Sequence, residues 1–309
     1  MKRLAIALLL IFFFYPGIFA QPDMGIAGSV EWEAMRLNAA ISLDLASAGI
    51  RIPSGRTRAQ SLLSAGFLNL LRPSILELQV DSSSTVADII ARGQISMQEI
   101  EAIALRADSV APALSPDMQK ISASYSISME SFVSALLSHN RPSPVSRILN
   151  PISTARYTGI IIIAADELPV YGMRSTALAI PCLFPKIWDS EMNLIYDRNM
   201  LETARQETDF QNAAWANTVR YSSIDNIFEN NPSGLSARLQ EIAGHRPLRI
   251  FARGVFGTNP TDLIIDRSDA LLILSSEENR RLLSQGRIVF ILDDSVLRSE
   301  FDSGKEPQL

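Results

Sequence analysis

The sequence predicts an α+β protein in which small mixed sheets are flanked by helices and arranged in two lobes. Four consecutive isoleucines within Thr158–Ala165 indicate a strand that is buried on both faces. Met118–Ile127 alternates apolar and polar side chains, which is the pattern of a half-buried strand. Amphipathic segments surround both strands, and the three prolines of His139–Pro151 make that stretch the best candidate for a linker or long loop.

Length and composition are those of an ordinary globular protein. The chain has 309 residues, which is enough for one large domain or two small ones, and 47% of them are apolar. The formal net charge is −5, and no basic stripe runs along the sequence. Nucleic-acid binding requires clustered Lys and Arg opposite the phosphates, so we expect no nucleic-acid partner.

The N-terminus has the features of a secretory signal. Lys2 and Arg3 precede an apolar run, Leu4–Tyr15, which is shorter than the ~20 residues needed to span a bilayer. We therefore predict a signal peptide at residues 1–20 that is cleaved after Ala20, and a periplasmic location. An uncut N-terminal anchor is the alternative. Gln21 stands where a lipoprotein would have Cys, so no lipid anchor is expected.

Residues 21–150 are predicted to form a mostly helical N-terminal domain with one strand at 118–127. Ser29 is a candidate N-cap, and Ser96-x-x-Glu99 is a capping box. The expected helices are Ser29–Ala48, Thr57–Leu71 (stopped by Pro73), Val86–Ala91, Ser96–Arg106 and Met129–Leu137.

Residues 151–309 are predicted to form an α+β C-terminal domain. Its clearest module, Arg246–Asp294, contains strands at Leu248–Val255, Asp262–Ile265 and Arg287–Leu292 and a helical segment at Ser268–Gln285. We expect the first and last of these strands to share a sheet with Ile160–Ala165. Further expected elements are a hairpin at Pro185–Tyr196, helices at Arg198–Glu207 and Ser233–Ala243, and a strand at Trp215–Tyr221.

Several sequence phrases resemble the lipoprotein-20 type of bacterial envelope proteins, which overlap with the flagellar assembly and motility proteins called P and T. The matching positions are Trp32, Tyr125, Thr158–Glu167, Pro185-Lys186-Ile187, Tyr196-Asp197, Asp262–Ile265, Asp269-Ala270 and Arg287–Asp293. The resemblance implies an α+β protein of the cell envelope, often associated with flagellar motor or surface structures, without known chemistry.

Three features depart from the pattern of that family. The lipidation Cys is missing, so outer-membrane anchoring does not carry over. The mostly helical stretch Thr57–Leu114 is longer than expected. Ala165-Asp166-Glu167-Leu168 replaces a more usual glycine-rich turn, so the backbone geometry of the family at that turn does not carry over.

Acidic residues follow several predicted strands, in the pairs Asp166/Glu167, Asp189/Glu191 and Asp293/Asp294. Adjacent residues on a strand point to opposite faces, so Asp293 and Asp294 would not converge without a turn. We interpret all three pairs as solvated strand ends rather than a metal or acid–base site, since structural acidic clusters are common. No catalytic, cofactor or metal residues are predicted.

The remaining reactive residue types lack the neighbours that known sites require. His139 and His245 have no zinc-ligand spacing, and Cys182 has an apolar context typical of a buried thiol. Gly254–Gly257 is followed by Thr-Asn-Pro and a strand, so we interpret it as a turn rather than a phosphate loop.

The leading functional expectation is a non-enzymatic structural or assembly protein of the periplasm or cell envelope, associated with the flagellar apparatus. Its expected partners are other envelope or flagellar proteins, with self-association also possible through exposed sheet edges. The alternative is a periplasmic module that binds a small molecule or peptide in a pocket lined by Ile160–Ala165 and Trp188. A hydrolase using Asp166 or Asp293 is the least favoured class. No cofactor is expected.

Overall fold

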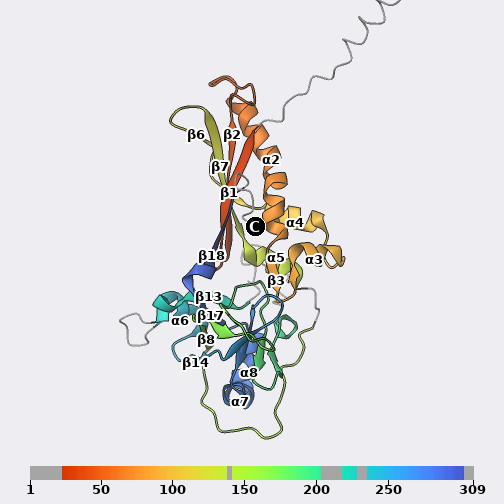
Figure 1. Cartoon of the computed structure of the whole chain (residues 1–309), viewed down its shortest axis with the longest axis vertical. Helices are drawn as coiled ribbons and strands as arrows, with labels where there is room; N and C mark the ends of the chain where they lie inside the picture. The colour runs from red at the N-terminus through yellow and green to blue at the C-terminus, as the bar shows by residue number, and fades with distance from the viewer. Residues whose placement is uncertain (1–22, 138–140, 203–217, 228–234, 303–309) are drawn as a thin grey trace, which may run out of the picture.

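The computed structural model describes residues 23–137, 141–202, 218–227 and 235–302. The predicted signal peptide, His139 and Trp215 lie outside these ranges, as does the second half of the helix expected at Arg198–Glu207. Within the described ranges, none of the helices combines the length and apolarity needed to cross a bilayer. The fold is α+β, with two lobes arranged along the long axis of the molecule (Figure 1).

The N-terminal lobe is built on an antiparallel sheet whose largest strands are β1 (Met24–Glu31), β2 (Arg36–Asp44) and β7 (Lys120–Ser128). The sheet order is β18-β1-β2-β7-β5, with β6 also on β7. The three short strands of this sheet are β5 (Asp108–Ser109), β6 (Ala113–Leu114) and β18 (Arg298–Asp302). Helix α2 (Arg56–Leu76) runs beside the sheet (Figure 1).

The expected helix at Ser29–Ala48 is wrong, because this stretch forms β1, a turn and β2. Leu37, Ala39, Ile41 and Leu43 are all buried, which is the two-residue period of a strand. Small apolar residues occur often enough here to satisfy a helical period as well. The description of this region as mostly helical with one strand is therefore wrong in its strand content.

The other helices of this lobe agree better with the sequence. Capping boxes at Thr85/Asp88 and Ser96/Glu99 begin α3 (Val86–Ala91) and α4 (Met97–Ala104), and α5 covers Met129–Leu136. Pro73 does not stop α2, which continues to Leu76, because a proline in the last turn removes only one helical hydrogen bond. A short hairpin, β3 (Gln79–Asp81) with β4 (Ser84–Thr85), follows α2.

The C-terminal lobe contains a four-stranded parallel sheet and a four-stranded mixed sheet. The parallel sheet has the order β13 (Arg220–Ser223), β17 (Ile288–Leu292), β8 (Ile160–Ala164), β14 (Leu248–Phe251). The mixed sheet has the order β12 (Leu194–Tyr196), β11 (Ile187–Asp189), β16 (Asp262–Ile265), β15 (Gly254–Phe256). The predicted hairpin at Pro185–Tyr196 is confirmed, as is the shared sheet of β8, β14 and β17.

Two predicted elements of this lobe are each divided in two. Leu248–Val255 is split between β14 and β15, which belong to different sheets. The helical segment at Ser268–Gln285 is split into α7 (Arg267–Leu274) and α8 (Glu277–Ser284), where Ser276 accepts a hydrogen bond from the Asn279 backbone as the N-cap of α8. The remaining elements are β9 (Leu168–Pro169), β10 (Thr176–Ala177), α6 (Ala237–Ala243), α9 (Asp294–Leu297) and the 3₁₀ turns Arg198–Met200 and Ile224–Ile227.

The two lobes share one continuous apolar core and a returning strand. The core cluster includes Trp32 and Leu78 from the N-terminal lobe and Leu183 and Tyr221 from the C-terminal lobe. After α9 the chain returns as β18, which pairs with β1, although the sequence assigns residues 298–302 to the C-terminal domain. The lobes are therefore connected at both ends of the C-terminal lobe.

Candidate functional site

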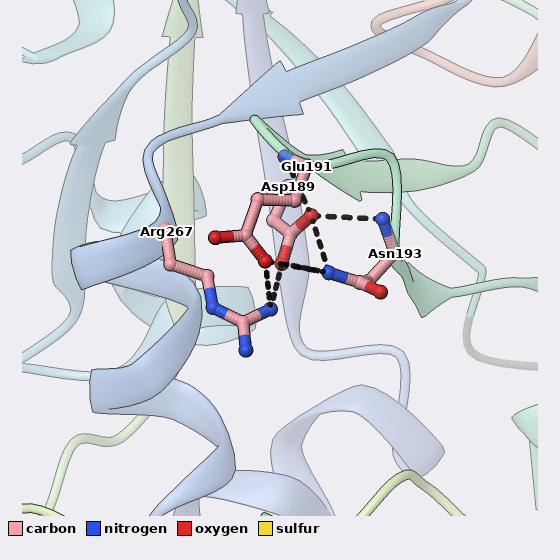
Figure 2. A network of polar contacts seen from close by, with 4 residues as sticks. All are labelled: Asp189, Glu191, Asn193 and Arg267. Carbon is pink, nitrogen blue, oxygen red and sulfur yellow. Dashed lines mark hydrogen bonds and ion pairs between the residues drawn. The ribbon is translucent and has the colours of Figure 1, made fainter.

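The most concentrated polar network surrounds Asp189, at the carboxyl end of β11 (Figure 2). Its side chain is fully buried. The Asp189 Oδ1 atom accepts hydrogen bonds from the backbone N–H groups of Glu191 and Asn193 at 3.0 and 2.8 Å. Asn193 Nδ2 donates to both carboxylate oxygens, at 3.1 and 2.9 Å, and Arg267 Nη1 donates to Oδ2 at 2.5 Å.

The electrostatics of this network stabilise the ionised carboxylate. Burial raises the pKa of Asp189, but the hydrogen bonds from Asn193, Arg267 and the Glu191 backbone outweigh it, and the pKa lies below its usual value. The carboxylate oxygens of Asp189 thus accept hydrogen bonds from the turn between β11 and β12 and from Arg267, the first residue of α7. The network holds these two elements together, and the interpretation of Asp189 as a solvated strand end is wrong.

A second buried carboxylate, Asp262, lies at the start of β16 and joins the two lobes. Its Oδ2 atom accepts hydrogen bonds from Ser82 Oγ of the β3–β4 hairpin at 3.1 Å and from Trp188 Nε1 at 3.2 Å. Its Oδ1 atom accepts from the Lys186 backbone N–H at 3.2 Å and from Thr261 Oγ1 at 3.2 Å. Burial raises the pKa of Asp262 above its usual value despite these donors.

Two of the other acidic residues singled out in the sequence, Glu167 and Asp293, serve local structure. Glu167 accepts a hydrogen bond from Thr176 Oγ1 at 2.7 Å, across the β9–β10 hairpin. Asp293 caps α9 by accepting from the Ser295 backbone and hydroxyl, and these bonds lower the pKa of Asp293. Asp166 and Asp294 follow the neighbouring parallel strands β8 and β17 at the same edge of the sheet. Across the described residues, no three His, Cys, Asp or Glu side chains are grouped as a metal site would require.

Cys182 is buried in the core, as its sequence context predicts. Burial raises the pKa of its thiol, with a smaller contribution from the charge of Asp262. A thiol held protonated in this way is a poor nucleophile.

The expected ligand pocket behind β8 is not where the sequence places it. Ile160, Ile161 and Ile162 have no exposed surface, and Trp188 directs its Nε1 to Asp262. A cavity of about 390 Å³ lies elsewhere, between the lobes. Its lining includes Trp32, Glu77 and Gln79 from the N-terminal lobe, Pro181 from the C-terminal lobe, and Arg298 and Phe301 from β18.

The turn between β1 and β2 contacts the C-terminal lobe directly. The Trp32 ring lies edge-on to the Tyr221 ring, with centroids 5.8 Å apart, and the Tyr221 hydroxyl donates to the Cys182 carbonyl at 2.7 Å. Glu33 Oε1 accepts from Ser222 Oγ at 3.0 Å and from Asn226 Nδ2 at 2.9 Å.

Two further contacts extend this joint between the lobes. Arg220 of β13 forms an ion pair with Glu130 of α5, and both side chains are mostly buried. The β3–β4 hairpin accepts backbone hydrogen bonds from Leu183 and Phe184 at 3.0 and 2.8 Å. We call the Trp32–Met35 turn, the β3–β4 hairpin, α5 and their contacts in the C-terminal lobe the interlobe joint. The sequence does not predict the interlobe joint, because the residues that contact each other across it are far apart in the chain. Of these residues, only Trp32 stands at a position that the family pattern distinguishes.

These features define a two-lobed α+β protein whose buried acidic groups have structural roles. The comparisons agree with a chain of two parts. Residues 23–135 match the family described as Treponema pallidum Tp0624, N-terminal domain, and residues 159–294 match the family described as Treponema pallidum Tp0624, second domain. The chain is thus similar to two domains of that protein, in the same order. No curated protein matches the chain. The resemblance to the lipoprotein-20 and flagellar families stays a prediction.

Proposed function

We propose that this protein is a non-enzymatic structural or assembly component of the bacterial cell envelope, exported to the periplasm and associated with the flagellar apparatus. The observation that carries the non-enzymatic part is the use of the buried polar groups. Throughout the described ranges, each buried side-chain nitrogen or oxygen atom has a hydrogen-bond partner. Active sites commonly hold polar groups aimed at a substrate, whereas the acceptors of Asp189 and Asp262 are engaged by the protein itself.

The interlobe joint supports the structural part of the proposal. Binding modules that close on a ligand need lobes that move, with a joint of few contacts. Here the lobes share an apolar core, and Trp32, Glu33, Ser82 and Glu130 all bond to or pack on the C-terminal lobe. Such a joint favours a rigid body that presents fixed surfaces to other proteins. Export and the flagellar association rest on the signal-like N-terminus and on the family resemblance.

A binding module remains the second candidate, and the cavity between the lobes favours it. Trp32 and Phe301 supply apolar lining, while Glu77 and Arg298 supply opposite charges. About 390 Å³ is enough for a small ligand or for a few side chains of a peptide.

Deletion of the gene tests the flagellar part of the proposal. We expect a defect in swimming and a missing or disordered density in the motor when cells are imaged by cryo-electron tomography, both restored by the gene in trans. Normal swimming together with an unchanged motor would contradict the flagellar association. A mature protein retained in the cytoplasm after cell fractionation would contradict export.

A further inference from the structure

The outer edge of β18 is an open position in the N-terminal sheet. Within the described residues β18 pairs with β1 alone, and it ends the sheet order β18-β1-β2-β7. The opposite side of the sheet is different, because β5 and β6 both pair with β7 there. The side chains of Arg298 and Glu300 are 61% and 76% exposed, so both are accessible to a partner.

The backbone register shows which groups this edge offers. The Trp32 N–H donates to the Leu297 carbonyl at 2.9 Å, in the same register as the β1–β18 pairs. Hydrogen-bonded and non-hydrogen-bonded pairs alternate along antiparallel strands, so Ser299 and Phe301 direct their backbone groups toward β1. The backbone N–H and C=O groups of Arg298 and Glu300 therefore point away from the sheet, toward an added strand.

We propose that β18 is a self-association edge, on which β18 of a second copy of this chain pairs antiparallel about a two-fold axis at Ser299. In that register Arg298 lies opposite Glu300 of the second copy, and Glu300 lies opposite its Arg298. Cross-strand neighbours of opposite charge stabilise a strand pair, and the symmetry provides this pair twice.

The surroundings leave room for the second strand. Arg298–Phe301 line the cavity between the lobes together with Ser74, Glu77 and Gln79, so open space borders β18. Phe301 packs on Gly28 of β1, which fixes β18 in the sheet. A strand added at this edge continues the sheet from one copy into the next. The contact is short, so we expect a weak, concentration-dependent dimer.

Disulfide trapping tests this geometry directly. The two copies of Ser299 form a non-hydrogen-bonded pair, in which Cα atoms lie about 4.5 Å apart, within the range of a disulfide. The mature Ser299→Cys chain should form a covalent dimer under mild oxidation. Ser295→Cys, another exposed serine just before β18, should stay monomeric as the matched control. The only natural cysteine, Cys182, is fully buried and gives no background. Equal crosslinking of the two variants would overturn the proposal.

Charge reversal tests the register. Arg298→Glu and Glu300→Arg each place like charges opposite each other, and each should weaken the dimer about tenfold or more in sedimentation equilibrium. The double variant R298E/E300R restores opposite charges and should recover the dimer. Both residues contact each other within one chain, so circular dichroism must first show that each variant is folded.

Two other results would also overturn the proposal. The first is an unaltered chain that stays monomeric at every concentration up to about 1 mM, because its dissociation constant would then exceed that of even very weak association. Alternatively, slow hydrogen exchange at Arg298 and Glu300 in a monomer would mean that another part of the same chain covers the edge. The inference concerns self-pairing alone, so it can fail while the envelope proposal holds, and the reverse is also true.

Discussion

Asp189 and Asp262 are two buried carboxylates whose pKa values move in opposite directions. Asp189 has more and stronger donors, including a guanidinium, and its pKa is lowered. Asp262 accepts only from neutral groups, and burial raises its pKa. The hydrogen-bond donors around each carboxylate therefore decide whether its ionised form stabilises the folded protein at neutral pH.

Replacing Asp189 by Asn should lower stability at neutral pH by about 1–3 kcal/mol, because Arg267 and two backbone donors lose their charged acceptor. The lowered pKa means that the contribution is fully present above the unfolded pKa, near 3.8, and is lost as the pH falls through the lower folded pKa. Urea unfolding from pH 3 to pH 7 measures it. The variant should approach the unaltered protein at acid pH, and an equal gap at every pH would contradict this account.

Asp262 should have the opposite pH dependence. Its folded pKa is raised, so the unfolded chain ionises first and stability falls as the pH rises from about 3.8 through the folded pKa. Asp262→Asn removes this fall. The unfolding free energy of the variant minus that of the unaltered protein should therefore increase with rising pH over that window. The same urea titrations measure the trend, and a difference that worsens with pH would refute the assignment.

At the scale of elements, the sequence predicts best where the signal is local. Capping boxes place α3 and α4, and the isoleucine run places β8. The β1–β2 hairpin is mispredicted, because Ser29–Ala48 contains enough small apolar residues to fit both a helix and a strand. Only the pairing of β2 with β7, far along the chain, selects the strand.

The buried polar contacts could not be predicted for the same reason. Arg267 is 78 residues from Asp189, and Ser82 is 180 residues from Asp262. Nothing in the local sequence of either residue identifies its partner. The prediction that Cys182 is buried succeeded, because an apolar neighbourhood is a local property.

Gly28 tests how β18 is held in the sheet. A Cβ atom at this position would lie 2.2 Å from the Asn38 carbonyl oxygen and 2.4 Å from the Phe301 ring. Gly28→Ala should therefore cost about 1–3 kcal/mol, through overpacking, and should increase hydrogen exchange along β18. Gly25→Ala on the same strand is the matched control, because its nearest neighbour would be 3.5 Å away. Equal effects of the two substitutions would contradict the packing described for Phe301.

At the scale of the whole molecule, the shared core predicts that the two lobes unfold together. Trp32 is 5% exposed and packs on Tyr221 of the other lobe. We expect a single calorimetric transition for the unaltered protein, and a loss of about 3–5 kcal/mol for Trp32→Ala, a core truncation that also weakens the interlobe joint.

Tyr171→Ala is the control for this experiment, because Tyr171 lies in the C-terminal lobe with a side chain that is 52% exposed. This control should change stability little. Two separate transitions in the unaltered protein would show that the lobes are independent and would remove the argument for a rigid body.

Chemical crosslinking in intact cells, followed by purification of the tagged chain from the envelope fraction and mass spectrometry, tests the proposed role most directly. A structural or assembly component should recover envelope proteins, flagellar components among them, in excess over a tagged secreted protein of unrelated fold. Recovery of no envelope protein above that control would contradict the proposal.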